Sequence, residues 1–560
     1  MQTPIQGFVD FGERTTWGLA LFWQDVVTSA FYCYQLQSQL DVCYLAFCSY
    51  SQPFIINLAS VPGRRFSNSK TTPSPVRYVP YYQRLNIICI TETYLNKSEL
   101  MSDKQETAKG LKKVLGFASL FIISVGIVVS QTSVVSILQG AGLGGGTFFI
   151  AILIAFIITI CYISTYSELA LILPKAGSIS TYTTVSIGHF PAIIAALSAY
   201  VAPAVFGSIA ELLLLQNVLN TIIPGFFINM SLIVIWIFTV LNILGIDLFA
   251  SVQSIISFTM LITLFAIGFV GMNVTNSQGI TPAHILQGLI HPNSSVFTLV
   301  LVALWPFIAF EMICDFIEEA KNPVKHIPKV MYSACITLLF AYCLIAFVAM
   351  KLLNAEQLTN TETPHLALGN VIFGNAGKVI ILVLSITTTC GFISTGFATT
   401  PRLLFGMAHH KQLPAIFMKL HRKWRTPWFG ILVIAILVTI ALLIFRNNQD
   451  ALLMLVISGA SCYLLAYIIA HIDLMVLRKK HPNYPRPFRA PWVPLLQIIG
   501  ISGMIYAFIN NSPTPKLRLN VYITVAIFIA VTAGFAFYWV KYKMKTGLFK
   551  PETIDQAIKD

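Results

Sequence analysis

Charged residues are scarce in this chain of 560 residues. Only 10% of the residues are Asp, Glu, Lys or Arg, whereas 56% are hydrophobic, and a soluble globular protein carries about 25% charged residues. This composition excludes a large soluble enzyme, a disordered regulator and a collagen-like fibre. The formal net charge of +14 would suggest a nucleic-acid partner for a soluble chain, but in a membrane protein it indicates basic cytoplasmic loops. We therefore expect no nucleic-acid partner.

Motifs of enzymes, cofactors and metal sites are missing as well. The chain contains no HExxH motif and no P-loop, so we expect neither an enzyme nor ATP-driven transport by this chain alone, and no cofactor. Its ten cysteines include no CxxC pair, which argues against a disulfide framework and against a zinc site. The glycine-rich run at 140–146 is predicted to be an external turn and not a phosphate loop.

The first hundred residues lack an apolar run of membrane-spanning length, because charged residues interrupt every candidate. They also lack a secretory signal. They contain no methionine after Met1, and Met101 opens a polar stretch that leads into the first apolar span. We expect residues 1–100 to be an over-extended gene model or a dispensable, disordered leader, and residues 101–113 to be a cytoplasmic tail. The alternative is a genuine accessory domain that carries four cysteines.

Apolar stretches of spanning length repeat from Val114 onward, and about 20 residues suffice for one crossing. We predict an all-α integral membrane protein, with a twelve-helix domain at 114–540 and a cytoplasmic tail at 541–560. The predicted spans are 114–138, 147–172, 191–220, 227–244, 248–272, 297–316, 330–352, 377–400, 428–445, 452–476, 491–510 and 520–540.

The basic residues test this topology. Of the 29 lysines and arginines after residue 100, 24 lie in segments that the topology places in the cytoplasm, and five lie in external loops. Cytoplasmic loops of membrane proteins carry such an excess. The bias predicts a multi-pass protein of the plasma (inner) membrane with both termini in the cytoplasm.

Two of the predicted spans carry residues that interrupt a continuous helix. Polar residues occupy 130–133 in the first span, and the sixth span contains Pro306, where a helix interior loses a hydrogen bond. The breaks lie five spans apart, which is the offset expected if spans 1–5 and 6–10 are inverted repeats. Broken helices at matching positions point to the binding site of a transporter. The alternatives are helix packing by the polar cluster and a tolerated proline kink.

Four motifs at predicted cytoplasmic helix ends carry a family resemblance. They are YSELALILPKAGSISTY at 166–182, FEMICDFIEEAKNPVKHIPKVM at 310–331, PRLLFGMAHHKQLPAIF at 401–417 and LRKKHPNYPRPFRAPWVP at 477–494. Together they resemble the amino acid–polyamine–organocation (APC) superfamily of permeases, over about residues 110–545. The resemblance implies a 5+5 inverted repeat plus helices 11 and 12, with the substrate bound mid-membrane between the broken helices 1 and 6.

The resemblance also implies which residues bind the substrate. The predicted substrate-binding residues are Ser130, Gln131, Thr132, Ser133, Trp305, Phe307, Ile308 and Ala309. Many members carry a glycine-rich triplet at the first break and a glycine before Phe-Glu at the second, where this chain has residues 131–133 and Ala309. These bulkier residues narrow the approach to the backbone, so Gln131 is a candidate to hydrogen-bond an atypical substrate directly. Trp305 matches the aromatic residue that caps the substrate in the agmatine–arginine exchanger; the alternative is an aromatic residue packed between helices.

Ionisable residues inside spans are costly and mark functional sites by default. Glu211 in span 3 is expected to bind a substrate ammonium or to carry a proton, and the alternative is a protonated structural acid. Glu311 matches a family position tied to proton coupling; the alternative is a link between neighbouring helices. No histidine lies within reach of either break by sequence. A solvated ion-pair network acting as an inner gate is expected from Glu168, Asp315, Glu318 and Glu319 with Lys175, Lys321 and Lys325, and likewise from His471 and Asp473.

Some relatives bind sodium through a Ser/Thr pair in helix 8, and Ser394 and Thr395 are the matching cation candidates here; no other metal site is expected. We predict a secondary active transporter of amino acids or related small amines, working by alternating access with proton symport or substrate exchange. The alternatives are a sodium-coupled or a polyamine/organic-cation transporter of the same fold and, in another class, an ion channel. The expected partners are a small-molecule substrate and the lipid bilayer, and the chain is expected to be a monomer or a homodimer.

Overall fold

The computed structural model describes residues 113–223, 230–275, 278–445, 451–512 and 515–559. The predicted extension at 1–100 and all but the last residue of the predicted tail at 101–113 lie outside the described residues. Within these ranges every regular element is a helix, and the isolated β-bridge joins Leu115 to Ala320. The predicted all-α class is therefore confirmed for the part of the chain that is described.

The helices follow the predicted apolar spans closely. In the described ranges, nine helical stretches are long and apolar enough to cross a membrane, and three shorter apolar helices accompany them. Eight of these stretches contain a long helix, namely α5 (Phe148–Ile172), α8 (Ala202–Ile222), α10 (Ile246–Asn273), α13 (Pro323–Leu352), α16 (Gly377–His409), α17 (Trp428–Phe445), α18 (Ala451–Lys480) and α20 (Pro515–Tyr538). The ninth runs from Ser295 to Phe316 and consists of shorter pieces. The shorter ones are α3 (Phe117–Val128), α9 (Met230–Ile243) and α19 (Leu495–Ile509).

Short helices connect or interrupt these spans. The α-helices among them are α4 (Gln131–Gly144), α6 (Ser178–Ser186), α7 (His189–Ala196), α11 (Pro282–Ile290), α12 (Ser295–Leu304), α14 (Ala355–Thr359), α15 (Pro364–Phe373) and α21 (Ile554–Lys559). Others are the 3-10 turns η1 (Gly145–Thr147), η3 (Trp305–Phe307), η4 (Phe310–Phe316), η5 (Gly374–Ala376) and η6 (Ala415–Met418), and the π-helical turns η2 (Leu197–Val201) and η7 (Trp539–Met544).

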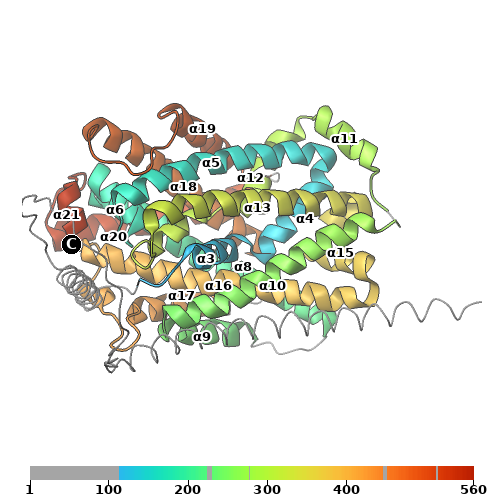
Figure 1. Ribbon diagram of the computed structural model, residues 1–560, viewed down its shortest axis with the longest axis horizontal. Helices are drawn as coiled ribbons and strands as arrows, with labels where there is room; N and C mark the ends of the chain where they lie inside the picture. Colours follow the sequence, from blue (N-terminus) through green and yellow to red (C-terminus); the bar gives the residue numbers. More distant parts are fainter. Residues whose placement is uncertain (1–112, 224–229, 276–277, 446–450, 513–514, 560) are drawn as a thin grey trace, which may run out of the picture. The chain divides into compact units, whose positions relative to one another are not determined.

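The two short helices α3 and α4 lie among the long ones. Figure 1 shows α5, α10, α13 and α16 running roughly parallel, with α3 and α4 as separate pieces between them. α3 packs against α10, α13 and α16, and α4 packs against α12, α13 and α8. The predicted first span is therefore split inside the bundle, where its polar backbone groups need partners from neighbouring helices.

Two glycines permit close turns and contacts near this region. Gly245 has φ +126° between α9 and α10, a conformation that a glycine adopts without steric cost, so the two predicted spans are separate helices. A Cβ on Gly126 of α3 would lie 2.0 Å from Nε2 of Gln253 on α10. A side chain at this position would require the buried Gln253 amide and the Ser257 hydroxyl to move.

Candidate functional site

The first predicted break separates α3 from α4. α3 ends at Val128, Val129 and Ser130 have extended backbones, and α4 begins at Gln131. The Ser130 hydroxyl accepts the Ser133 N–H at 3.1 Å and caps the new helix. Because the first N–H groups of a helix have no partner inside it, the start of α4 presents hydrogen-bond donors within the bundle.

Glu211 of α8 satisfies these donors with both of its carboxylate oxygens. Oε2 accepts the Gln131 N–H at 2.8 Å, and Oε1 accepts the Thr132 N–H at 2.8 Å and the Thr132 hydroxyl at 2.6 Å. Glu211 is fully buried, and the N-terminus of a helix stabilises such an anion. We call the N–H groups of Gln131 and Thr132 together with the Thr132 hydroxyl the α4 cradle. The cradle holds a carboxylate, and that carboxylate belongs to the protein.

The second predicted break follows α12. A 3-10 turn covers Trp305–Phe307, Ile308 is extended, and Ala309 has φ +83° before η4 begins. This left-handed conformation costs a residue other than glycine about 1–2 kcal/mol. Ala309 is thus held in a strained conformation at the position where the sequence departs from the usual glycine.

Two tyrosines satisfy the backbone that the second break exposes. The Tyr467 hydroxyl accepts the Ala309 N–H at 2.9 Å, and the Tyr162 hydroxyl donates to the Phe307 carbonyl oxygen at 2.7 Å. The two tyrosine rings stack with their centroids 4.2 Å apart. Tyr467 also donates to Oε2 of Glu311 at 2.7 Å, while Oε1 of Glu311 is buried without a partner in the described part of the chain.

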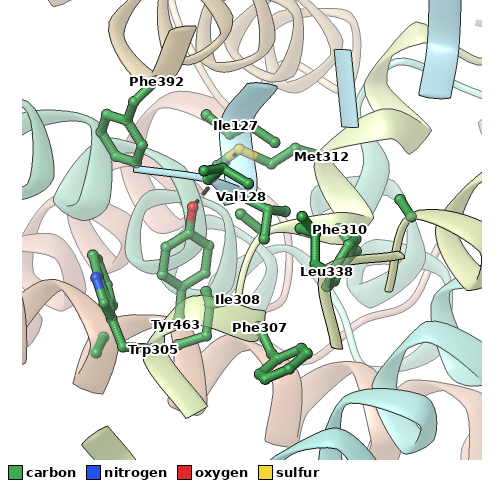
Figure 2. Packing of buried hydrophobic residues seen from close by; sticks show 14 of the residues in the cluster. Ile127, Val128, Trp305, Phe307, Ile308, Phe310, Met312, Leu338, Phe392 and Tyr463 are labelled. Carbon is green, nitrogen blue, oxygen red and sulfur yellow. Dashed lines mark hydrogen bonds between the residues drawn. The ribbon is translucent and has the colours of Figure 1, made fainter. Parts of the chain in front are cut away.

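The two breaks meet at Trp305. Its indole N–H donates to the Thr132 hydroxyl at 3.1 Å, so a residue of the second break binds the α4 cradle directly. Apolar side chains surround Tyr463 (Figure 2): Trp305 and Ile308 lie beside its ring, and Ile127, Val128, Met312 and Phe392 lie toward its hydroxyl end. Phe307 instead packs its ring edge-on against Tyr342, with the centroids 5.5 Å apart.

The structure brings most of the predicted site residues together, but not all of them. Residues 130–133 lie at the start of α4 with Glu211 and Trp305 bonded to them. Glu311 is bonded to Tyr467 and belongs to a separate cluster. Of the cation candidates on α16, the Ser394 carbonyl accepts the Asn242 amide at 3.1 Å, and the Thr395 hydroxyl is buried without a partner among the described residues.

A histidine does reach the first break, so the prediction that none lies within reach was wrong. Nε2 of His365 lies 3.1 Å from Nε2 of Gln131, and His365 is buried on α15, which packs against α4. The Thr389 hydroxyl of α16 completes the contacts at 3.1 Å from Oε1 of Gln131 and 3.4 Å from Oε2 of Glu211. Neither residue was marked by the sequence, because His365 falls in a predicted external loop and span 8 carries many hydroxyls.

A cavity of about 320 Å³ borders the α4 cradle. Thr132, Ser136 and Gln139 of α4 line it, with Leu214 of α8 and Glu362 ahead of α15. The residue whose hydroxyl binds Glu211 and Trp305 therefore borders this cavity, and a small molecule in the cavity would contact Thr132.

Comparison with known proteins identifies the family. A family model described as amino acid permease matches residues 115–535. The chain belongs to this amino acid permease family. The serine/threonine exchanger SteT of Bacillus subtilis is 26% identical over 464 residues, which cover 78% of this chain and 98% of that protein. The branched-chain amino acid permease BcaP of the same species is 23% identical over 455 residues, covering 75% and 93% of the two chains.

A solved structure supports the fold of this permease. A mutant of the manganese transporter from Eremococcus coleocola aligns with a TM-score of 0.52 and 12% identity, covering 77% of this chain and 97% of that one. This likeness concerns the fold alone. The resemblance to amino acid permeases that the sequence motifs carried is confirmed, and the relatives are multi-pass membrane transporters and not enzymes.

Buried ion pairs hold the permease together toward the far end of α16. Arg402 pairs with Glu319 at 2.6 and 3.0 Å, and Glu168 pairs with Arg478 at 2.6 and 3.0 Å and with Arg486 at 3.0 Å. The predicted partners were wrong, because these carboxylates bind arginines and not the nearby lysines. The prediction that this ion-pair network is exposed to solvent was wrong too, since both Glu168 and Glu319 are buried. α16 continues past its predicted end, and this places Arg402 on a buried helix face.

The remaining carboxylates of this predicted network, together with His471, bond to neutral groups instead of to arginines. The Asp315 carboxylate accepts the Tyr200 hydroxyl at 3.0 Å, and Glu318 accepts the Ala176 N–H at 2.9 Å. Asp473 accepts the hydroxyls of Thr183 and Ser186, and Nδ1 of His471 lies 2.9 Å from the Thr165 hydroxyl. His471 and Asp473 are fully buried, so the expected solvated ion pair between them is not formed.

The C-terminal segment docks on the same side. The Glu552 carboxylate lies 3.3 Å from Nε2 of His189 and 3.0 Å from Nδ1 of His410. Burial raises the pKa of Glu552, but the hydrogen bonds from the two histidines outweigh burial and lower the pKa to about 2. Within the described ranges, no group of three or more His, Cys, Asp or Glu residues is arranged to hold a metal ion.

Proposed function

We propose that this permease is a secondary active transporter that moves an amino acid across the plasma membrane by alternating access. The observation that carries the proposal is the junction of the two broken helices, where the Trp305 indole binds Thr132 at the start of α4. A site at such a junction can close from either side, because each half-helix moves with a different set of neighbours. The cavity beside Thr132 and the buried ion pairs at the other end support an outward-facing state.

The proposed topology has twelve spans, with spans 1–5 and 6–10 as inverted repeats and two further helices. In it, α3 and α4 form span 1, α12 to η4 form span 6, and α9 and α19 cross the membrane despite their short length. The end that carries Arg402, Arg478 and Arg486 faces the cytoplasm in this topology, since basic residues accumulate there. The cavity lined by Thr132 then opens to the outside.

Proton symport or substrate exchange is the proposed driving mechanism. Two fully buried carboxylates, Glu211 and Glu311, lie at the two breaks, and ionisable groups within a membrane protein commonly carry protons. Sodium coupling is a second candidate, supported by the Thr395 hydroxyl, which is buried without a partner among the described residues. Most of the relatives' names refer to amino acids, which favours amino acids over amines as the substrate class.

Counterflow in proteoliposomes tests this function. Vesicles that contain the purified full-length protein are loaded with unlabelled L-serine, L-threonine, L-leucine or spermidine and receive the same labelled compound outside, with and without a pH gradient. We expect saturable counterflow of at least one L-amino acid. Ionic current without counterflow would point to a channel, and the absence of any amino acid counterflow would refute the proposal.

Trp305→Ala probes the junction itself. The substitution removes the indole hydrogen bond to Thr132, which is worth about 0.5–1.5 kcal/mol, together with the ring that borders the site. We expect about a tenfold or larger loss of apparent affinity in counterflow. Trp236→Ala on α9 is the matched control, because Trp236 is 40% exposed and forms no hydrogen bond to either break within the described ranges. Equal activity of both variants would show that the site is misplaced.

A further inference from the structure

Every N–H group at the start of α4 already has a partner. Glu211 accepts those of Gln131 and Thr132, the Ser130 hydroxyl accepts that of Ser133, and the Ser130 carbonyl accepts that of Val134 at 3.2 Å. A substrate carboxylate that is to bind the unwound helix needs the same donors. In the described conformation it finds no free donor at this break.

We propose that Glu211 is a tethered substitute for the substrate carboxylate, and that the substrate enters the α4 cradle only after Glu211 has taken up a proton and left it. This inference rests on the proposed amino acid transport and adds the way in which binding is coupled to the proton. One O–H bond forms on Glu211, with the proton supplied by the external solution. The substrate carboxylate then accepts the N–H groups of Gln131 and Thr132 and the Thr132 hydroxyl, so the cradle holds one negative charge before and after the exchange.

The geometry favours this role over that of a permanent helix cap. Ser130 already caps α4 locally, whereas Glu211 comes from another helix and brings a fully buried charge. No lysine or arginine bonds to Glu211 within the described ranges, and burying a charge without an opposite charge is costly. The α4 cradle is also reachable, because Thr132 lines the cavity of about 320 Å³. A buried anion held by neutral donors beside an open cavity is suited to replacement by another anion.

Glu211 is the carboxylate that bonds to the start of α4 in the described part of the chain. Of the helices packed against α8, α4, α9 and α17 contain no ionisable side chain. α16 faces Glu211 with the Thr389 hydroxyl. The tyrosines of η2 and α18 are directed to other groups, since Tyr200 bonds to Asp315, Tyr463 to Met312 and Tyr467 to Glu311. Two further titratable groups lie on helices that are not packed against α8. Tyr342 is on α13, and His365 is on α15, where its ring lies against the Gln131 side chain.

Titration calorimetry in two buffers of different ionisation enthalpy tests the exchange on the purified full-length protein. The probes are L-serine, L-threonine and L-leucine, each paired with the amine formed by loss of its carboxylate. We expect about one proton to be taken up for each amino acid bound and none for each amine. Because one proton is linked to binding, the apparent Kd of the amino acid should rise about tenfold per pH unit once Glu211 is ionised.

Variants decide whether Glu211 is the group that takes up the proton. In Glu211→Gln the proton uptake and the pH slope should both vanish, whereas Glu356→Gln, at an exposed position of α14, should keep both. If Glu211→Gln does not fold, Glu211→Asp serves instead: its shorter side chain holds the cradle less well, so the amino acid should bind more tightly and still take up one proton.

The outcomes separate this inference from the proposed function. Amino acid binding without proton uptake, or uptake that survives Glu211→Gln, overturns the exchange and leaves amino acid transport standing. If none of the six probes binds and none of the three amino acids shows counterflow, the proposed function fails and the exchange fails with it.

Discussion

The buried pair of Arg402 and Glu319 predicts how firmly its end of the helix bundle is held together. Nε and Nη2 of Arg402 lie 2.6 and 3.0 Å from the two carboxylate oxygens, and Nη1 donates to the Ala398 carbonyl at 2.6 Å. The guanidinium also lies 4.7 Å above the Phe316 ring. Both charged side chains are at most 3% exposed. Removing one partner of such a pair costs about 3–5 kcal/mol, because the other charge stays buried and unpaired.

Arg402→Met should therefore weaken the closed state strongly. If the lost free energy falls on the contact between α16 and η4, the balance between the closed and open states of this end shifts by more than about a hundredfold. The native Cys314 of η4 reports on this opening, since its thiol is fully buried in the closed state. We expect faster maleimide labelling of Cys314, located by peptide mass spectrometry, together with a lower thermal midpoint in detergent.

A double variant and a control show whether the effect of Arg402→Met comes from the unpaired charge of Glu319. Replacing both Arg402 and Glu319 by Met removes both charges, and exchanging a buried ion pair for apolar residues is often neutral or stabilising. The double variant should regain most of the thermal midpoint and the protection of Cys314. Lys378→Met, at an exposed position of the same helix, should change neither quantity. If Arg402→Met leaves both unchanged, the reasoning from the buried pair is refuted.

Two further predictions concern the second break and the C-terminal segment. Ala309→Gly relieves the left-handed strain and should raise the free energy of unfolding. The expected gain is about 0.5–1 kcal/mol, because the greater chain entropy of glycine in the unfolded state offsets part of the relief. Ala309→Val should lower the free energy of unfolding, and thermal unfolding in detergent measures both variants. The lowered pKa of Glu552 means that its contribution to docking is complete above pH 4.5 and is lost as the pH falls through about 2. Hydrogen exchange of 548–559, corrected for its intrinsic pH dependence, should lose protection in that window, and Glu552→Gln should be unprotected already at neutral pH.

The positions of the membrane helices were predictable because each depends on a local property of the chain. A run of about 20 apolar residues suits a helix that crosses the bilayer, and the predicted span at 428–445 has the same bounds as α17. The two breaks were predictable for a similar reason. Pro306 lacks an N–H group, and Ser130 is a good helix cap, so both interruptions are written into residues next to them.

The partners of the buried polar groups were not predictable in this way. Glu211 lies 80 residues from Gln131, and His365 lies 234 residues from it. Glu168 binds Arg478 from 310 residues away, although Lys175 lies much closer in the sequence. A buried charge must find a hydrogen-bonding partner, but the partner it meets depends on which helix faces pack together.

Local chemistry thus determined the helices, their breaks and the family of this permease, because apolar length, proline, capping residues and short motifs act within a few residues. Only the tertiary structure decided that the start of α4 is occupied by Glu211, that Trp305 binds Thr132, and that Glu319 and Glu168 pair with arginines. These contacts join helices that are distant along the chain, and the packing of the whole bundle selects them. The candidate site is therefore a property of the assembled helices, although residues 130–133, Glu211 and Trp305 were each marked within a single predicted span.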